Sequence, residues 1–255
     1  MTTDDTALAG ELARSAVALL QELRAGSPLE GTALKDAGDA ASERFLAERF
    51  RSARPGDAVL SEEAVDDPAR LTADRVWIVD PLDGTREFSE GRDDWAVHVA
   101  LWERGLGLTA GAVATPTGTR TTGDAAPGDA GLAEALDGLR RLRLAVSRSR
   151  PPALVGGLLN LLRAEAVPMG SAGVKTLAVV SGAADAYVHA GGQYEWDSAA
   201  PVAVARAAGL HTSRIDGSPL EYNRADPLLP DLVVCPPALA DRLLGAIATV
   251  LEGEA

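Results

Sequence analysis

The sequence predicts a layered α+β fold in which helices pack on mixed and antiparallel sheets. Apolar residues alternate over 95–102, and Gly105 and Gly107 separate this run from a second apolar run over 108–114, which is typical of an antiparallel hairpin. Residues 7–24 carry apolar side chains at steps of three and four, as in an amphipathic helix. Because strands and helices do not alternate strictly along the chain, these features favour packed layers over a doubly wound parallel sheet.

The same reasoning locates the other elements and a boundary between two domains. Further helices are expected over 39–50, 152–163, 170–182, 195–209 and 238–251, and further strands over 58–61, 76–79, 142–146, 186–189 and 231–235. Loops are expected over 26–38 and 115–131, with a hairpin turn at Asp216-Gly217. The second loop places the boundary near residue 140, which gives an N-terminal domain, 1–140, and a C-terminal domain, 141–255.

Composition narrows the classes of function. The chain has 255 residues and a net charge of −13, which disfavours nucleic-acid polymers and anionic membranes as main partners because both require basic surfaces. Cys235 is the single cysteine, so an internal disulfide and a cysteine-rich zinc site are excluded. The N-terminus lacks a signal-peptide core, and no apolar run is long enough to span a bilayer, so we expect a cytoplasmic protein.

The most informative stretch is 76–88, where an apolar strand runs directly into two carboxylates. Asp80 and Asp83 follow the strand, and Pro81 and Gly84 predict a tight turn between it and a short helix. The first N–H groups of a helix have no partners within it, so this helix offers free donors close to the two acids. The combination suits a phosphate that is held by metal ions, although a plain turn also explains these residue types.

Four acids are candidate metal ligands, namely Glu62, Asp80, Asp83 and Asp197. All supply hard oxygen donors, which favour Mg²⁺ or Mn²⁺ over zinc or copper, and the carbonyl of Leu82 can join them. Helix capping alone is an alternative role for Asp197, and for Asp39 at the expected start of the second helix. A covalent aspartyl-phosphate mechanism of the haloacid dehalogenase type fails on spacing, because two residues rather than one separate Asp80 and Asp83.

Three motifs of this chain resemble those of the inositol monophosphatase superfamily and follow one another along the chain as they do in that family. Residues 80–85 read Asp-Pro-Leu-Asp-Gly-Thr, as in the first signature of that family. Glu62-Glu63 resembles its upstream acidic pair, and residues 196–201 resemble its Trp-Asp signature. The resemblance implies a five-layer αβαβα fold and Mg²⁺-dependent, lithium-sensitive hydrolysis of a small phosphate ester, with two or three Mg²⁺ ions for which Mn²⁺ can substitute.

The resemblance also implies roles for individual residues. Glu62, Asp80 and the carbonyl of Leu82 would hold a first metal, and Asp80, Asp83 and Asp197 would hold a second. Glu62 would thereby take part in catalysis, since the first metal activates the attacking water.

The phosphate and the attacking water have their own implied partners. Gly84 and Thr85 would bind phosphate through their backbone N–H groups. The side chains of Thr85 and Asp39 would orient the attacking water, which makes both of them candidate catalytic residues.

Within the superfamily, the Gly-Thr-Arg-Glu-Phe run at 84–88 is similar to the CysQ-type 3′(2′),5′-bisphosphate nucleotidases. That branch implies a small phosphorylated nucleotide, 3′-phosphoadenosine 5′-phosphate or its sulfated relative, and a role in sulfate assimilation. Arg148 and Lys175 are candidates for gripping the 5′-phosphate, with Ser171 and Trp196 also in the substrate-binding set. The run Ala172-Gly173 departs from the Ser-Leu that is commoner in this branch.

Three alternatives remain open at this point. Inositol monophosphatase or fructose-1,6-bisphosphatase activity would fit the same scaffold. A metal-binding regulatory protein that has lost turnover belongs to a different class. Family analogy alone also leaves a homodimer open. The three histidines, His98, His189 and His211, are not clustered in the sequence and receive no role.

Overall fold

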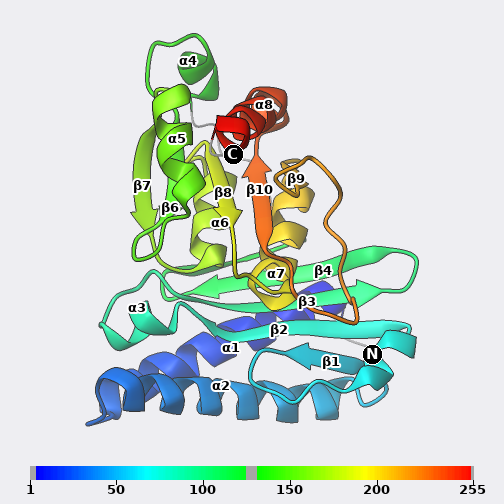
Figure 1. Cartoon of the computed structure of the whole chain (residues 1–255). Helices are drawn as coiled ribbons and strands as arrows, with labels where there is room; N and C mark the ends of the chain where they lie inside the picture. Colours follow the sequence, from blue (N-terminus) through cyan, green and yellow to red (C-terminus); the bar gives the residue numbers. More distant parts are fainter. Residues whose placement is uncertain (1–3, 125–130, 254–255) are drawn as a thin grey trace.

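The computed structural model describes residues 4–124 and 131–253, which form five layers (Figure 1). The helices are α1 (Asp5–Gly26), α2 (Gly31–Ala53), α3 (Thr85–Ser89), α4 (Leu132–Leu136), α5 (Ala153–Leu161), α6 (Ala172–Val180), α7 (Glu195–Ala207) and α8 (Pro237–Gly253), with a 3₁₀ turn η1 at Pro68–Thr72. Helices α1 and α2 form the first layer, α6 and α7 the middle layer, and α5 with α8 the last. A sheet separates each pair of helical layers, so the expected αβαβα architecture is confirmed.

The first sheet has the strand order β1-β2-β3-β4-β5. Its strands are β1 (Ala58–Ser61), β2 (Arg75–Asp83), β3 (Ala96–Glu103), β4 (Gly107–Thr115) and β5 (Gly118–Thr121). Strands β1 and β2 are parallel, and the other neighbours are antiparallel, which includes the expected β3–β4 hairpin.

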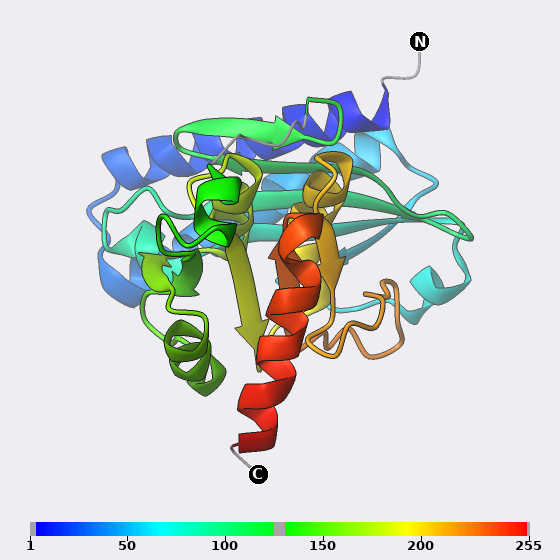
Figure 2. The same ribbon diagram turned by 90° about the horizontal axis from the view of Figure 1, so that it is seen from above.

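The second sheet has the order β7-β6-β8-β10-β9. Its strands are β6 (Arg143–Ser147), β7 (Glu165–Met169), β8 (Ala186–Ala190), β9 (His211–Ser213) and β10 (Asp231–Cys235). Strand β6 is parallel to both of its neighbours, whereas β10 is antiparallel to β8 and β9. Figure 2 looks onto α8, which lies over the outer face of this sheet.

Buried apolar side chains form one cluster in each gap between layers. The middle cluster joins the two halves of the chain, because Ile78 and Val113 of the first sheet and Val234 of the second pack with α6 and α7. The sheets fall on either side of residue 140, but they share this core. The division into domains 1–140 and 141–255 stays a prediction.

Several expected boundaries were wrong. Helix α2 begins at Gly31 rather than at residue 39, so most of the expected loop 26–38 is helical and Asp39 lies within the helix, not at its N-cap. Strands β5, β7 and β9 were not expected. Asp216-Gly217 forms a turn between Arg214 and Ser218, but β9 pairs with β10 rather than with a strand after that turn. Within the expected loop 115–131, residues 125–130 lie outside the described part of the chain.

Strand β2 carries the central motif farther than the apolar run indicated. It extends to Asp83, and its pairing with β3 shifts between Asp80 and Asp83. Such an irregularity re-aims side chains at the end of a strand. The Ser42 hydroxyl on α2 donates to the Pro81 carbonyl at 2.7 Å and holds this irregular segment against the first layer.

Candidate active site

A cavity of about 410 Å³ opens where the ends of β2 and β8 meet the starts of α3, α6 and α7. It is lined by Glu62, Asp80, Leu82, Asp83, Gly84, Thr85, Arg86, Glu87, Ser147, Ser149, Arg150, Pro152, Gly170, Ser171, Ala172, Lys175, Tyr187, His189, Ala190, Gly191, Gly192, Gln193 and Asp197. All five predicted metal-ligand positions are therefore brought together, although they come from distant parts of the chain. A larger cavity, near α4 and α5, contains none of these acids.

Asp80 is fully buried at the floor of this cavity. Its Oδ1 accepts the N–H of Leu82 at 3.0 Å, while Oδ2 has no hydrogen-bond partner among the described residues. Burial, and then the negative charges of Glu62, Asp83 and Asp197, raise the pKa of Asp80 well above its ordinary value.

Asp83 is held by donors from the N-cap and the first turn of α6. Its Oδ2 accepts the Ser171 hydroxyl at 2.5 Å and the Gly173 N–H at 3.1 Å. Nε2 of His98 lies 3.3 Å from the same oxygen. The hydrogen bonds from Ser171 and Gly173 fix this carboxylate oxygen and orient the group toward the cavity that it lines.

The acids Glu62, Asp197 and Asp39 interact electrostatically with neighbouring acids. Glu62 keeps exposed surface, yet desolvation by its surroundings and the charges of Asp83 and Glu63 raise its pKa to about 7. Burial and the charge of Asp83 raise the pKa of Asp197 to about 8. Burial, with Glu63 next, raises the pKa of Asp39 to about 7. Acids this close to one another repel unless protons or cations neutralise them.

This donor set fits divalent cations. An unpartnered buried carboxylate oxygen on Asp80, with Glu62, Asp83 and Asp197 around it, is what a hard cation satisfies. Ligand atoms of Asp80, Asp83 and His98 lie within 4.8 Å of one another. Asp197 also caps α7, because its Oδ2 accepts the Tyr194 N–H at 2.7 Å, so the capping role and the cation-binding role can coexist.

We expect Mg²⁺ to stabilise the protein more at high pH than at low pH. In the folded, metal-free chain the raised pKa values of Glu62 and Asp197, about 7 and 8, keep protons bound that the unfolded chain releases near its ordinary values of 4.5 and 3.8. The metal-free free energy of unfolding therefore falls as pH rises from about 4 to about 8. Because cations compete with these protons, the Mg²⁺-induced rise in Tm should be small at about pH 6 and large at about pH 8.5. Thermal scans with and without Mg²⁺ measure this, and equal shifts at both pH values would contradict it.

Gly84 and Thr85, the candidate phosphate donors, lie at the start of α3. Gly84 precedes the helix with φ of +90°, and a Cβ there would lie 3.2 Å from Cβ of Trp95. A glycine is required because this left-handed backbone and close approach both disfavour a side chain. Gly84 and Thr85 line the cavity, where their backbone N–H groups can meet an anion.

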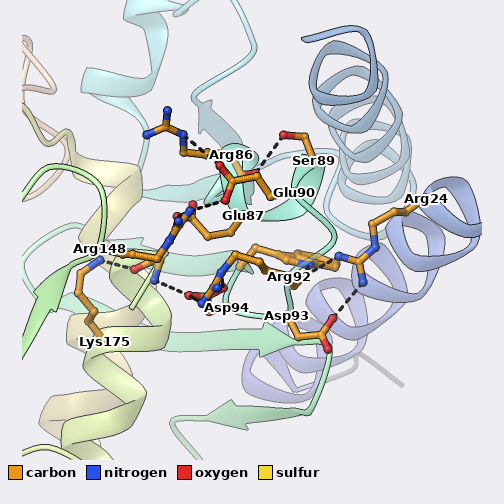
Figure 3. A network of polar contacts seen from close by, with 12 residues as sticks. Arg24, Arg86, Glu87, Ser89, Glu90, Arg92, Asp93, Asp94, Arg148 and Lys175 are labelled. Atoms are coloured by element: carbon orange, nitrogen blue, oxygen red, sulfur yellow. Dashed lines mark hydrogen bonds and ion pairs between the residues drawn. The ribbon is translucent and has the colours of Figure 1, made fainter. Parts of the chain in front are cut away.

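Arg148 forms ion pairs with acids in α3 and directly after it (Figure 3). Its guanidinium donates to Glu87 at 2.9 Å and to Glu90 at 2.6 Å. It is not among the described residues that line the cavity, whereas Arg150, two positions later, is. The Arg-Glu pair at 86–87 thus contributes to this network through a buried Glu87.

Lys175 and Ser171 line the cavity as expected, but both also support its wall. The Lys175 ammonium is buried and donates to the carbonyls of Gly170 and Ser171, the latter at 2.8 Å. Burial lowers the pKa of Lys175, and Asp83 opposes that shift. The ring of Trp196 stacks on Tyr194 at a centroid distance of 4.8 Å, outside the described lining.

Sequence reasoning missed His98 and Arg150 as site residues. His98 pairs in register with Asp80 across β2 and β3. This antiparallel register places His98 on the same face as Asp80, and it is a long-range pairing because α3 lies between the two strands. Arg150 lies two positions after Arg148 in the run Ser147-Arg148-Ser149-Arg150, and nothing in that run distinguishes the two arginines.

Comparison with solved structures identifies the class of fold. The chain is similar to the inositol monophosphatase TM1415 of Thermotoga maritima, with a TM-score of 0.77, 19% identity, and coverage of 99% of this chain and 100% of that one. At this identity the likeness concerns the fold alone.

In the described residues, no helix is both long and apolar enough to cross a membrane.

The chain belongs to the inositol monophosphatase family, whose model matches residues 5–252. A protein of Mycobacterium tuberculosis named 3′-phosphoadenosine 5′-phosphate phosphatase is 54% identical over 228 residues, 84% of this chain and 82% of that protein. A protein of the same name from Mycobacterium leprae is 51% identical over 261 residues, 97% of this chain and 95% of that one. These findings confirm the resemblance that the three acidic motifs indicated.

Proposed function

We propose that this protein is a Mg²⁺-dependent phosphatase that hydrolyses 3′-phosphoadenosine 5′-phosphate to AMP and inorganic phosphate. One observation carries the proposed chemistry: Glu62, Asp80, Leu82, Asp83 and Asp197 converge on one cavity beside the start of α3. The substrate is inferred from the relatives named 3′-phosphoadenosine 5′-phosphate phosphatase, which match most of the chain at 51% and 54% identity. The sulfated relative, 3′-phosphoadenylyl sulfate, is a second proposed substrate.

The family resemblance implies two cation positions. Glu62, Asp80 and the Leu82 carbonyl would hold one ion, and Asp80, Asp83 and Asp197 the other. Bound Mg²⁺ lowers the pKa of a water molecule and offsets the charge on the attacking and leaving oxygens. The same ions would relieve the mutual repulsion of these acids. Without them, a protein with a net charge of −13 would repel a phosphate dianion.

The chain's own groups position the reactants. The N–H groups of Gly84 and Thr85 would bind the phosphate oxygens, and the helix dipole of α3 adds to this in the same direction. The Thr85 hydroxyl and the Asp39 carboxylate would orient the attacking water. Asp39 is not among the described residues that line the cavity, and its charge is the last of the causes that act on the pKa of Glu62.

A comparison of substrates tests the proposed function. We expect Mg²⁺-dependent phosphate release from 3′-phosphoadenosine 5′-phosphate with a kcat/KM at least about tenfold above the values for inositol 1-phosphate and fructose 1,6-bisphosphate. Of the three substrates, only the nucleotide combines a second phosphate with an adenine base. A preference for inositol 1-phosphate would overturn the choice of substrate. Metal binding without phosphate release from any of the three would support a regulatory protein instead.

Arg150 is the better candidate for gripping the 5′-phosphate, since Arg148 is engaged by Glu87 and Glu90. We expect Arg150→Ala to raise KM for 3′-phosphoadenosine 5′-phosphate about tenfold, the loss of roughly one charged hydrogen bond. With adenosine 3′-phosphate, which lacks the 5′ group, the same variant should match the wild type.

Arg148→Ala is the matched control for that test. It removes the support of α3 and should lower kcat on both nucleotides. If Arg150→Ala changed the two substrates equally, Arg150 would not be the 5′ grip.

The wider setting is proposed on the same basis. We place the enzyme in the cytoplasm, in nucleotide recycling linked to sulfate assimilation, with Mn²⁺ able to replace Mg²⁺ and Li⁺ acting as an inhibitor. A homodimer is also proposed, by family analogy alone.

A further inference from the structure

A buried histidine lies directly beneath the candidate cation site, and the proposed chemistry does not use it. His98 on β3 has no exposed surface. Its Nδ1–H donates to the carbonyl of Trp196 at 3.2 Å, and its Nε2 lies 3.3 Å from Asp83 Oδ2 without hydrogen-bond geometry. One rigid ring therefore contacts a carboxylate at the end of β2 and the residue directly before Asp197 on α7.

The ring also explains the glycine at position 173. A Cβ on Gly173 would lie 2.2 Å from Nε2 of His98 and 2.9 Å from Cγ1 of Val113, so no side chain fits. The backbone of Gly173 is not in the left-handed region, so space rather than conformation requires a glycine here. With its small residue, α6 approaches closely enough for the Gly173 N–H to donate to Asp83 Oδ2 at 3.1 Å.

These contacts form a path between two proposed ligands of the second cation. Asp83 and Asp197 belong to different layers, and His98 is packed between their segments. A ligand pair needs its spacing held within about half an ångström to bind a small cation well, and that accuracy comes from the residues behind the ligands. A fully buried ring with a fixed partner at Trp196 supplies such support.

We propose that His98 is a positioning residue that sets the spacing of Asp83 and Asp197, and that residue 173 is a glycine because the His98 ring occupies the space of its side chain. The proposal rests on the cation site of the proposed function. It accounts for the departure of Ala172-Gly173 from the commoner Ser-Leu pair through a contact with β3 rather than through a change in substrate.

A double-mutant cycle tests the pairing. Mg²⁺ binding to the substrate-free, full-length protein is measured by calorimetry for His98→Ala, Gly173→Ala and the double variant, and Tm is measured for each. We expect His98→Ala to weaken Mg²⁺ binding about tenfold, the size of effect usual for groups behind a metal ligand. Gly173→Ala should weaken it at least as much in the wild type, and cost clearly less once the His98 ring is gone, because the Cγ1 methyl of Val113, at 2.9 Å, is then the nearest contact left.

Two further variants keep the result interpretable. His98→Asn places an amide donor near Nδ1 in a smaller side chain, so Gly173→Ala should also cost less in that background than in the wild type if His98→Ala does not fold. His211→Ala, on β9 and hydrogen-bonded to Ser213, is the control and should bind Mg²⁺ as the wild type does.

The outcomes separate this proposal from the proposed function. Unchanged Mg²⁺ affinity in His98→Ala, or an equal cost of Gly173→Ala with and without the ring, would overturn the role of His98 while the phosphatase stands. A wild-type protein that binds no Mg²⁺ would overturn both.

Discussion

Asp80→Asn is expected to abolish phosphatase activity and, at the same time, to stabilise the metal-free protein. The carboxylate would bind both cations, so its loss should lower kcat/KM by about 10³-fold or more, equal to roughly 4 kcal/mol of transition-state free energy. The Asn oxygen can still accept the Leu82 N–H that Asp80 Oδ1 accepts at 3.0 Å. Its amide adds no charge to a fully buried site beside Glu62, Asp83 and Asp197, so the metal-free Tm should rise by roughly 3–6 °C.

Asp226→Asn is the matched control for this variant. Asp226 accepts the N–H of Leu228, two residues on, at 3.0 Å, which is the same local contact as in Asp80, but it is exposed and outside the described cavity lining. Phosphate release and thermal unfolding should both match the wild type. An Asp80→Asn enzyme that keeps more than about a hundredth of the activity, or that melts earlier without metal, contradicts the cation site as described.

Gly170→Ala is expected to have the largest effect on folding stability. A Cβ at this position would lie 2.3 Å from the backbone oxygen of Asp94 and 2.5 Å from Cγ of Glu87, and a backbone oxygen cannot move aside easily. We expect a loss of about 3 kcal/mol in the free energy of unfolding, or roughly 6–12 °C in Tm. Because Ser171 follows and holds Asp83, kcat should also fall about tenfold.

Gly156→Ala provides the opposite case. Gly156 lies in α5, and no other group lies within 4 Å of the place that a Cβ would take there, so alanine should raise stability by about 0.5–1 kcal/mol through helix propensity. Urea unfolding of both variants gives the comparison. If Gly170→Ala were as stable as the wild type, the close packing of the 170–171 segment on α3 and Asp94 would be wrong.

The candidate ligands were indicated by local signals in the sequence, and the five layers by the resemblance of its motifs to a known family. Hard oxygen donors at a strand end, as at Asp80 and Asp83, are visible without tertiary information. The start of α2 could not be predicted in this way, because residues 26–38 are rich in Gly, Ser and Pro. The packing of Leu34 against the first sheet stabilises the helix there. Short strands such as β9 depend on their partner β10 rather than on their own residues.

The proposed grip on the 5′-phosphate was harder to predict than the proposed ligands, for a related reason. Arg148 and Arg150 have the same charge and lie two positions apart, and only the positions of Glu87 and Glu90 determine which one is taken up by α3. His98 likewise looks ordinary until the register of β2 and β3 places it opposite Asp80. The position of each of these side chains depends on long-range pairing, which no short window of a single sequence encodes.

The middle layer has a consequence for how the chain can be divided. Helix α7 is buried along most of its length between the two sheets, and it carries Asp197 to acids supplied by the first half of the chain. A polypeptide severed between the sheets would leave each piece with an uncovered apolar surface and an incomplete set of ligands. Recovery of catalysis on mixing two such fragments would then report their reassembly directly.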